Sequence, residues 1–180
     1  MSDETAAAEE AEAEAVAEEA AVDLRYGAAV SESHGDVVLH ATAETYLDVC
    51  SEAHADGFDQ LIDLTAVDYL TYVGERRLPG GLTPERFEVV TSLISHVRRE
   101  RIRIRTQVSA DEPTIPSLFD LWPGSEYLER EAFDMFGITF ADHPDMSRVL
   151  MPEDWVGHPL RKDYAVGAIP VQFKAASNER

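Results

Sequence analysis

The strictest constraint on the fold of this chain is the alternation in residues 101–108, Arg-Ile-Arg-Ile-Arg-Thr-Gln-Val. Successive side chains of a β-strand point to opposite faces, so Ile102, Ile104 and Thr106 share one face and the arginines share the other. Such a strand requires a sheet with one apolar and one polar face. The apolar run Phe87–Ser95 precedes it, and the two segments are predicted to pair as an antiparallel hairpin.

Further elements are expected before this hairpin. A strand at 36–40 leads into a helix that Thr42 caps and that runs to about Ala55. A bent strand over residues 58–72 follows this helix. A loop rich in Gly and Pro over residues 74–86 then leads to the hairpin.

Two helices are expected after the hairpin. Ser117 is predicted to cap a short helix that ends at Trp122, and Ser125 a longer helix that runs through Phe136 and closes at Gly137. The order of elements predicts an α+β fold. It would have a mixed, largely antiparallel sheet with helices packed on one face, and an irregular C-terminal arm.

The chain divides into three predicted segments. An acidic leader rich in Ala and Glu covers residues 1–23, the core domain covers 24–140, and an extended docking arm covers 141–180. The leader contains nine acids and no Lys or Arg, and the whole chain has a formal net charge of -20. We expect the leader to be disordered. An acidic surface disfavours nucleic acid and anionic lipid and favours basic partners, although solubility alone is an equal explanation.

Cysteine content and hydropathy limit the cellular compartments in which the chain is expected. Cys50 is its single cysteine, so an internal disulfide and a cysteine-only iron–sulfur site are excluded. It lies on an apolar stripe, which predicts a buried thiol. The acidic N-terminus does not resemble a signal peptide, and no run approaches the length that spans a bilayer. We expect a chain that is cytosolic or attached to a membrane from the cytosolic side.

Residues 129–163 are dense in charged, aromatic, Gly and Pro residues. On a helix, Glu126–Arg130 and Arg130–Asp134 are both pairs four residues apart, which predicts an ion-pair ladder that fixes the helix. The alternative is a catalytic pair of carboxylates that shift each other's pKa. If the ladder is buried at an interface, it determines geometry and partner choice more than stability.

Catalytic, metal and nucleotide motifs receive little support. Asp142, His143, Asp145 and His158 match no compact spacing of metal ligands, and His143 is predicted to anchor a loop by hydrogen bonds. Cys50 has no basic neighbour, and the glycines do not form a phosphate-binding loop. We therefore predict no catalytic residue, no metal and no NADH, flavin or nucleotide site in this chain.

The last block, residues 155–164, reads Trp-Val-Gly-His-Pro-Leu-Arg-Lys-Asp-Tyr. This mixture of aromatic residues and arginine is enriched at interface hot spots, which predicts docking against a partner. The alternative is a packed wrap over the chain's own sheet.

These motifs resemble those of the C subunit of respiratory complex I, the proton-pumping NADH:quinone oxidoreductase. One signature comprises Glu129-Arg130-Glu131, then Asp134-Met135-Phe136, and then His143. The other is Trp-x-Gly-His-Pro-Leu-Arg-Lys-Asp-Tyr, in the same order and spacing. The chain departs from the family pattern at Ser147, where Arg, Lys or Pro is usual, whereas the next position, Arg148, fits.

The resemblance implies a non-catalytic structural subunit of the hydrophilic arm, on the cytoplasmic side of the cell membrane. It would be peripheral, with no membrane span. It would sit beside the D subunit, which helps form the quinone site, and hold that subunit in position. It would also lie near the B subunit, which is the small iron–sulfur protein of the complex. Iron–sulfur clusters, FMN and quinone are expected in partner subunits and none in this chain. The residues expected at the partner interface are Glu129, Arg130, Glu131, Asp134, His143, Arg148, Trp155, His158, Arg161, Lys162 and Asp163.

Three alternatives stay open. The chain could be the equivalent subunit of a membrane-bound nickel–iron hydrogenase or of a complex fed by ferredoxin or deazaflavin. It could be a small enzyme that uses Glu131, Asp134 or His143, which predicts a concave pocket. It could also be an autonomous binding module whose acidic leader engages a basic partner.

Overall fold

The computed structural model describes residues 23–165. The predicted leader, apart from Asp23, and the predicted arm beyond residue 165 therefore lie outside the described residues. The main sheet has six strands in the order β1-β2-β3-β6-β5-β4. Their bounds are Leu24–Arg25 (β1), Ala28–Ser33 (β2), Asp36–Thr42 (β3), Gln60–Asp68 (β4), Phe87–Ser95 (β5) and Glu100–Val108 (β6).

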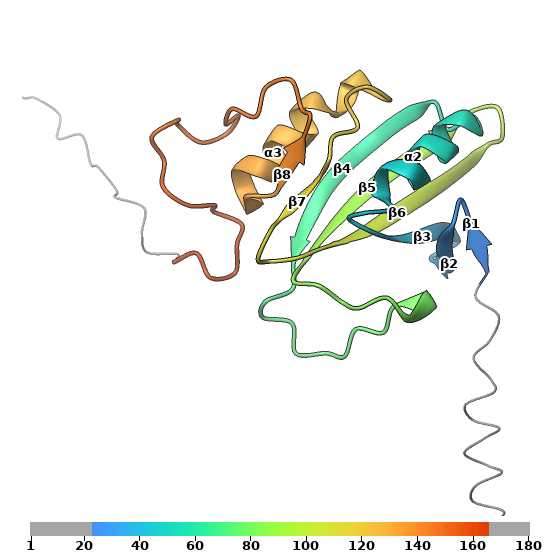
Figure 1. Cartoon of the computed structure of the whole chain (residues 1–180), viewed down its shortest axis with the longest axis horizontal. Coiled ribbons are helices and arrows are strands. Elements are labelled where there is room, and N and C mark those ends of the chain that lie inside the picture. The colour runs from blue at the N-terminus through green and yellow to red at the C-terminus, as the bar shows by residue number, and fades with distance from the viewer. Residues whose placement is uncertain (1–22, 166–180) are drawn as a thin grey trace, which may run out of the picture.

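Within residues 23–165, the remaining elements are two helices, two 3-10 turns and a small second sheet. These are α2 (Tyr46–Ala55), α3 (Glu126–Phe136), η1 (Pro79–Gly81), η2 (Pro123–Ser125), and the parallel pair β7 (Thr114–Pro116) and β8 (Thr139–Ala141). Within the main sheet, β3 and β6 are parallel and the other pairs are antiparallel. Both helices lie on one face of this sheet (Figure 1). The predicted α+β fold with a mixed, largely antiparallel sheet is confirmed.

The predicted hairpin is the pair β5–β6. Ile104 lies opposite Thr91 and Ile102 opposite Leu93, and all four side chains are buried. The helix α2 packs on this face, where the Tyr46 hydroxyl is 2.8 Å from the Thr91 hydroxyl. The alternating pattern therefore did identify the face of the sheet that carries the core.

Helix α2 buries the predicted thiol but begins later than expected. Cys50 is fully buried, and burial raises the pKa of its thiol. Thr42 does not cap the helix, because it is the last residue of β3; Thr45 precedes the helix and makes no side-chain capping bond. The Thr42 hydroxyl instead accepts a hydrogen bond from the Thr45 amide at 3.3 Å.

The helix predicted to begin at Ser117 is wrong. Residues 119–121 form a turn and η2 follows. The Ser117 hydroxyl and the Leu118 amide both donate to the buried Glu129 carboxylate, so their hydrogen bonds are satisfied without a helix. Ser125 does precede α3 as expected, but its hydroxyl makes no capping bond.

The strands β1 and β2 were not expected, whereas the bend in β4 was. The sequence of β2, Ala-Ala-Val-Ser-Glu-Ser, has little apolar alternation, and it pairs with β3 through a tight turn in which His34 and Gly35 have positive φ. The register of β4 against β5 shifts between Leu61 and Asp63, which is consistent with the predicted bend, but the strand covers Gln60–Asp68 and not the predicted residues 58–72.

The connection between β4 and β5 is tied to the face of the sheet opposite the helices. Glu88 is buried there, and its carboxylate accepts hydrogen bonds from Arg76 and Arg105 at 2.7 Å each. Arg76 also stacks over the Tyr69 ring at 3.5 Å. The long connection is thereby held on the sheet by a buried charge network.

Candidate functional site

Asp134 is the centre of the contacts between α3 and the arm, which we define as residues 142–165. Its carboxylate is fully buried and accepts a charged hydrogen bond from Arg148. It also accepts the amide hydrogens of Val149, Leu150 and Met151 at 3.1, 2.8 and 2.8 Å. One carboxylate on the last turns of α3 therefore holds three successive residues of the arm.

The predicted pair between Arg130 and Asp134 does not form, and this part of the ion-pair ladder is wrong. Arg130 lies 3.9 Å from Glu126 as expected, but its hydrogen bonds go to the arm. It donates to the carbonyl and the hydroxyl oxygen of Ser147 at 3.1 and 2.7 Å. Arg148, and not Arg130, pairs with Asp134, because the arm brings the Arg148 guanidinium over the helix.

This contact explains how a serine is accommodated at position 147, where the family usually has Arg, Lys or Pro. Its hydroxyl accepts a hydrogen bond from Arg130 and donates to Asp145. A Lys or Arg side chain at this position has no acceptor to offer a guanidinium. The departure from the family pattern is therefore compatible with a specific bond between α3 and the arm.

The second block of the arm covers the C-terminal end of α3. The carbonyls there lack partners within the helix, and α3 has no basic residue in its last turn. His158 donates from Nδ1 to the Asp134 carbonyl at 3.0 Å, and Arg161 donates to the carbonyls of Phe136 and Gly137. The arm thus supplies the cationic and hydrogen-bonding groups that this helix end needs.

A second attachment joins the arm to the ends of β4 and β5. The buried Asp68 carboxylate accepts two hydrogen bonds from Arg86, at 3.1 and 2.9 Å. It also accepts the Lys162 amide hydrogen at 2.9 Å. Arg86 in turn pairs with Asp163 at 2.9 Å. The end of the arm is therefore fixed to the core sheet by a carboxylate and a guanidinium that both lie outside the two sequence blocks.

Glu129 and His143 lie in the interior. Glu129 accepts from the Leu118 amide at 2.8 Å and the Ser117 hydroxyl at 2.6 Å, and burial raises the pKa of its carboxyl despite these bonds. His143 contacts the Glu126 carbonyl through Nε2 at 3.1 Å, and its Nδ1 accepts the Asp145 amide hydrogen at 3.0 Å. His143 is the loop anchor that its sequence context predicted.

The eleven residues expected at a partner interface thus divide into two groups. Seven are buried or partly buried and bonded to the chain itself: Glu129, Arg130, Asp134, His143, Arg148, His158 and Arg161. Glu131, Lys162 and Asp163 are exposed, and Trp155 is partly buried. The wrap over the chain's own core is therefore real, and it orients a smaller set of side chains outward.

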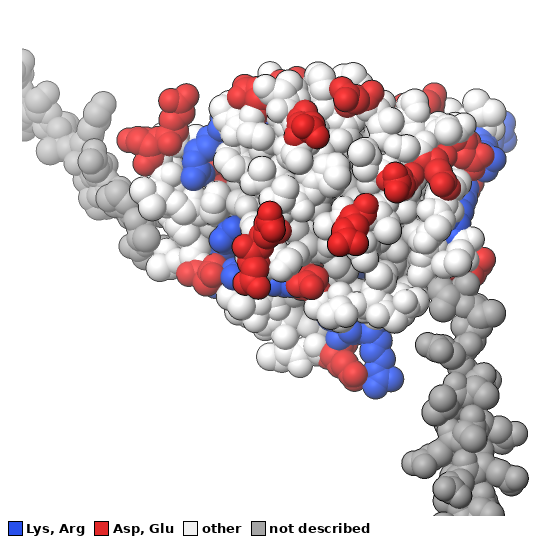
Figure 2. All heavy atoms as spheres, in the orientation of Figure 1, with Lys and Arg blue, Asp and Glu red and all other residues white. Residues whose placement is uncertain are grey.

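The outward face of the arm presents four large apolar side chains among exposed charged residues, which include Glu153, Asp154 and Lys162. Val149, Leu150, Val156 and Leu160 are 38%, 59%, 86% and 49% exposed. Figure 2 shows acidic side chains spread over the face of the molecule that carries the helices. The arm therefore combines a backbone that is hydrogen-bonded to the core with several exposed apolar side chains.

Asp134 and Asp68 predict how attachment of the arm depends on pH. Burial raises the pKa of the Asp134 carboxyl, but the Met151 amide, Arg148 and the other donors outweigh it and leave the pKa below its usual value. The pKa of Asp68 is likewise lowered, because the bonds from Arg86, Lys162 and Leu70 outweigh burial. A carboxyl with a depressed folded-state pKa stabilises the fold above its unfolded pKa of about 3.9, and that contribution is lost as pH falls through the folded pKa.

We therefore expect the amide resonances of Leu150 and Met151 to stay constant between about pH 7 and 5 and to change only below about pH 4. An NMR titration from pH 7 to pH 2 measures this. Titration of these two amides between pH 5 and pH 7 would contradict the assignment of Asp134 as their charged acceptor.

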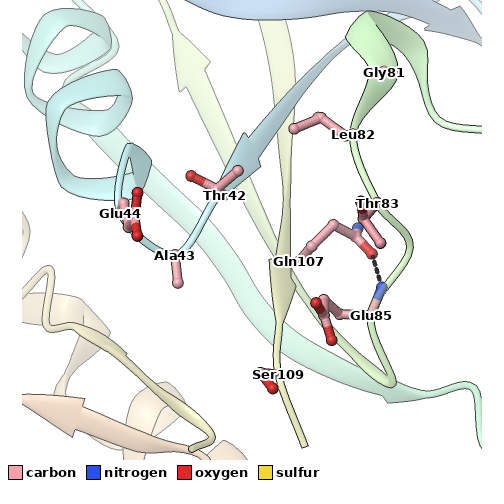
Figure 3. A pocket seen from close by; sticks show the side chains of 9 residues that line it. All are labelled: Thr42, Ala43, Glu44, Gly81, Leu82, Thr83, Glu85, Gln107 and Ser109. Atoms are coloured by element: carbon pink, nitrogen blue, oxygen red, sulfur yellow. Dashed lines mark hydrogen bonds between the residues drawn. The ribbon is translucent and has the colours of Figure 1, made fainter.

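One hollow of the described residues bears on the small-enzyme alternative. A hollow of about 400 Å³ lies between the end of β3 and the segment before β5 (Figure 3). Glu44 lies on one side and Glu85 on the other, with Gln107 between them accepting the Glu85 amide hydrogen. None of the three residues proposed for catalysis, Glu131, Asp134 and His143, lines it.

Neither a cluster of metal ligands nor a long apolar helix occurs in residues 23–165. Within this range, no three His, Cys, Asp or Glu side chains are grouped so that they could hold a metal ion. None of the helices described combines the length and the apolar character that crossing a bilayer requires.

Sequence comparison places this chain among respiratory proteins. Residues 39–169 match the family model described as the 30-kDa subunit of respiratory-chain NADH dehydrogenase. The C subunit of NADH-quinone oxidoreductase from Roseiflexus castenholzii is 47% identical over 146 residues, which cover 79% of this chain and 78% of that protein. Its counterpart from Saccharopolyspora erythraea is 36% identical over 150 residues, which cover 82% of this chain and 56% of that protein.

Two solved structures share the fold. A trypsin-resistant fragment of Nqo5 is 34% identical, with a TM-score of 0.59 over 66% of this chain and 89% of that chain. A chain of the membrane-bound sulfane sulfur reductase, an archaeal respiratory membrane complex, has a TM-score of 0.65 over 95% of this chain and 98% of that chain. At 20% identity, the second likeness concerns the fold alone.

Proposed function

The chain belongs to the family of the 30-kDa subunit of respiratory-chain NADH dehydrogenase, and on that premise we propose that it is a non-catalytic structural subunit. It serves a proton-pumping NADH:quinone oxidoreductase as the C subunit, in the hydrophilic arm. It contributes to electron transfer from NADH to quinone only as part of that complex. Its task is to hold in position the D subunit, which we call the quinone-site subunit.

The observation that carries this proposal is the bonding of the arm. Asp134 of α3 and the arm's own Arg148 and Arg161 hold the backbone of the arm on α3. Exposed apolar side chains, together with Glu153, Asp154 and Lys162, are left facing outward. A surface that is ordered before it binds loses less conformational entropy on binding, so this arrangement favours tight docking.

The partners and location follow from the same proposal. The quinone-site subunit binds the arm, and the B subunit and other proteins of the hydrophilic arm lie close by. The chain sits on the cytoplasmic side of the cell membrane as a peripheral part of the complex. FMN, the iron–sulfur clusters and quinone are bound by partner subunits, and the chain by itself does not oxidise NADH.

A pair of matched variants tests the docking role. Val156 is 86% exposed on the arm, and Val97 is 93% exposed at the turn between β5 and β6. We expect Val156→Asp to lower recovery of the quinone-site subunit with the tagged chain at least ~10-fold, because it places a charge in an apolar interface. Val97→Asp should have no effect, and neither variant should change the thermal midpoint of the purified chain. Recovery is measured by quantitative mass spectrometry after extraction in mild detergent.

The same measurement separates the alternatives. Recovery with a nickel–iron hydrogenase subunit, or with the subunits of a ferredoxin- or deazaflavin-fed complex, would assign the chain to that complex instead. Equal recovery of the quinone-site subunit with both aspartate variants would show that the arm does not form the interface. NADH oxidation by the purified chain above background would contradict the non-catalytic role.

A further inference from the structure

A second exposed apolar segment lies beside the arm, in the connection between β4 and β5. Leu70, Tyr72 and Val73 are 49%, 56% and 102% exposed. We call these residues the 70–73 loop. Such side chains are common singly on protein surfaces, but three within four residues, next to another apolar surface, form a patch.

Asp68 places the loop and the arm side by side. One of its carboxylate oxygens accepts the Leu70 amide hydrogen and the other accepts the Lys162 amide hydrogen, each at 2.9 Å. Both backbones are therefore held on the same carboxylate, although they are about ninety residues apart in sequence. In Figure 1 the connection leaves the end of β4 next to the last described part of the arm.

Backbone bonds extend this surface along the arm. The Leu160 amide donates to the Met135 carbonyl at 3.1 Å, and the neighbouring Asp134 carboxylate holds Val149 and Leu150. The exposed apolar residues of the loop and of the arm thus lie on two segments that are both bonded to the ends of β4 and α3. They are Leu70, Tyr72, Val73, Val149, Leu150, Val156 and Leu160.

The exposed area of the two segments is of the size that a protein partner covers. Together the seven residues present on the order of 700 Å² to solvent, close to the roughly 800 Å² that each partner buries in a standard interface. Charged groups of both signs border it: Glu75 and Arg77 on the connection, and Lys162 and Asp163 on the arm. An apolar centre with a polar rim is the anatomy of a protein interface.

We propose that the 70–73 loop is the second half of the interface that the arm forms, and that one apolar face of the same neighbouring subunit covers both. This inference rests on the proposed function, which names the quinone-site subunit as that neighbour. The loop adds specificity, because a partner must match two segments whose relative position is set by Asp68 and Arg86. Neither sequence block contains the loop.

Substitution of Val73 tests the proposal. Its side chain is fully exposed, so Val73→Asp should leave the thermal midpoint of the purified chain unchanged. In complexes extracted from native membranes, we expect it to lower recovery of the quinone-site subunit at least ~10-fold, as Val156→Asp does, while Val97→Asp stays at the level of the unmodified chain. The double variant Val73→Asp/Val156→Asp should lose more than either single variant.

The outcomes distinguish the two proposals. Loss with Val156→Asp but not with Val73→Asp would overturn the role of the loop and leave the docking role of the arm intact. No loss with either would overturn both. A purified chain that dimerises, and that Val73→Asp converts to a monomer without changing recovery of the quinone-site subunit, would show that a second copy covers the loop and would also overturn the proposal.

Discussion

Asp134→Ala is expected to release the arm and to lower the free energy of unfolding by about 3–5 kcal/mol. The substitution leaves the Arg148 guanidinium without its carboxylate in a largely buried position. It also removes the acceptor of three amide hydrogens, those of Val149, Leu150 and Met151. An unpaired buried charge and unsatisfied donors are among the most costly defects in a folded protein. Urea denaturation of the purified chain measures the change.

The matched control is Glu131→Ala, which removes an exposed carboxylate from the same helix. It should change stability by no more than about 0.5 kcal/mol. Hydrogen exchange of the amides at 149–151 reports on the arm directly, and we expect it to accelerate only in Asp134→Ala. Equal stabilities for the two variants would show that Asp134 does not hold the arm.

Gly137→Ala is the second substitution with a large expected effect, about 3 kcal/mol or more. Gly137 ends α3 with a φ of 72° and lies against the arm. A Cβ atom there would come within 2.6 Å of both the Arg161 guanidinium and the His158 ring. These groups cannot move away freely, because each is bonded to a carbonyl at the end of α3. The substitution therefore combines backbone strain with the loss of two attachments.

Gly81→Ala separates these two contributions. Gly81 has a similar φ of 67°, but a Cβ atom there would meet nothing within 4 Å. Backbone strain alone, about 1–2 kcal/mol, is expected at this position, with no effect on the arm. If Gly81→Ala and Gly137→Ala destabilise the chain equally in thermal unfolding, the packing of the arm on Gly137 contributes nothing.

The sheet was predictable where a local pattern determines it. The alternation of Ile102 and Ile104 with arginines identified the central hairpin and its buried face, because side chains of a strand alternate whatever the rest of the chain does. Gly137 likewise marked the end of α3 through its left-handed conformation. Cys50 was recognisable as a buried thiol from its neighbours on the helix.

The candidate site was only partly predictable, because its bonds join distant segments. The two sequence blocks drew attention to the correct residues, but Arg130 was paired with Asp134 on helical spacing alone, whereas Arg148 takes that position. Asp68 and Arg86 were missed because no local pattern links them to Lys162, 94 residues away from Asp68. Residues 70–72 were predicted to belong to the bent strand, whereas β4 ends at Asp68 and these residues lie in an exposed connection, since the exposure of their side chains depends on the tertiary fold.

Cross-linking of the intact complex tests most directly whether the arm docks on the quinone-site subunit. Lys162 and Lys174 are the only lysines of this chain, so lysine cross-links from it report on its C-terminal part alone. Mass spectrometry identifies the links made by Lys162, which is exposed on the arm. We predict links from Lys162 to the quinone-site subunit. Links from Lys162 to other proteins of the complex in the absence of any to the quinone-site subunit, or recovery of the chain apart from the complex, would contradict the account.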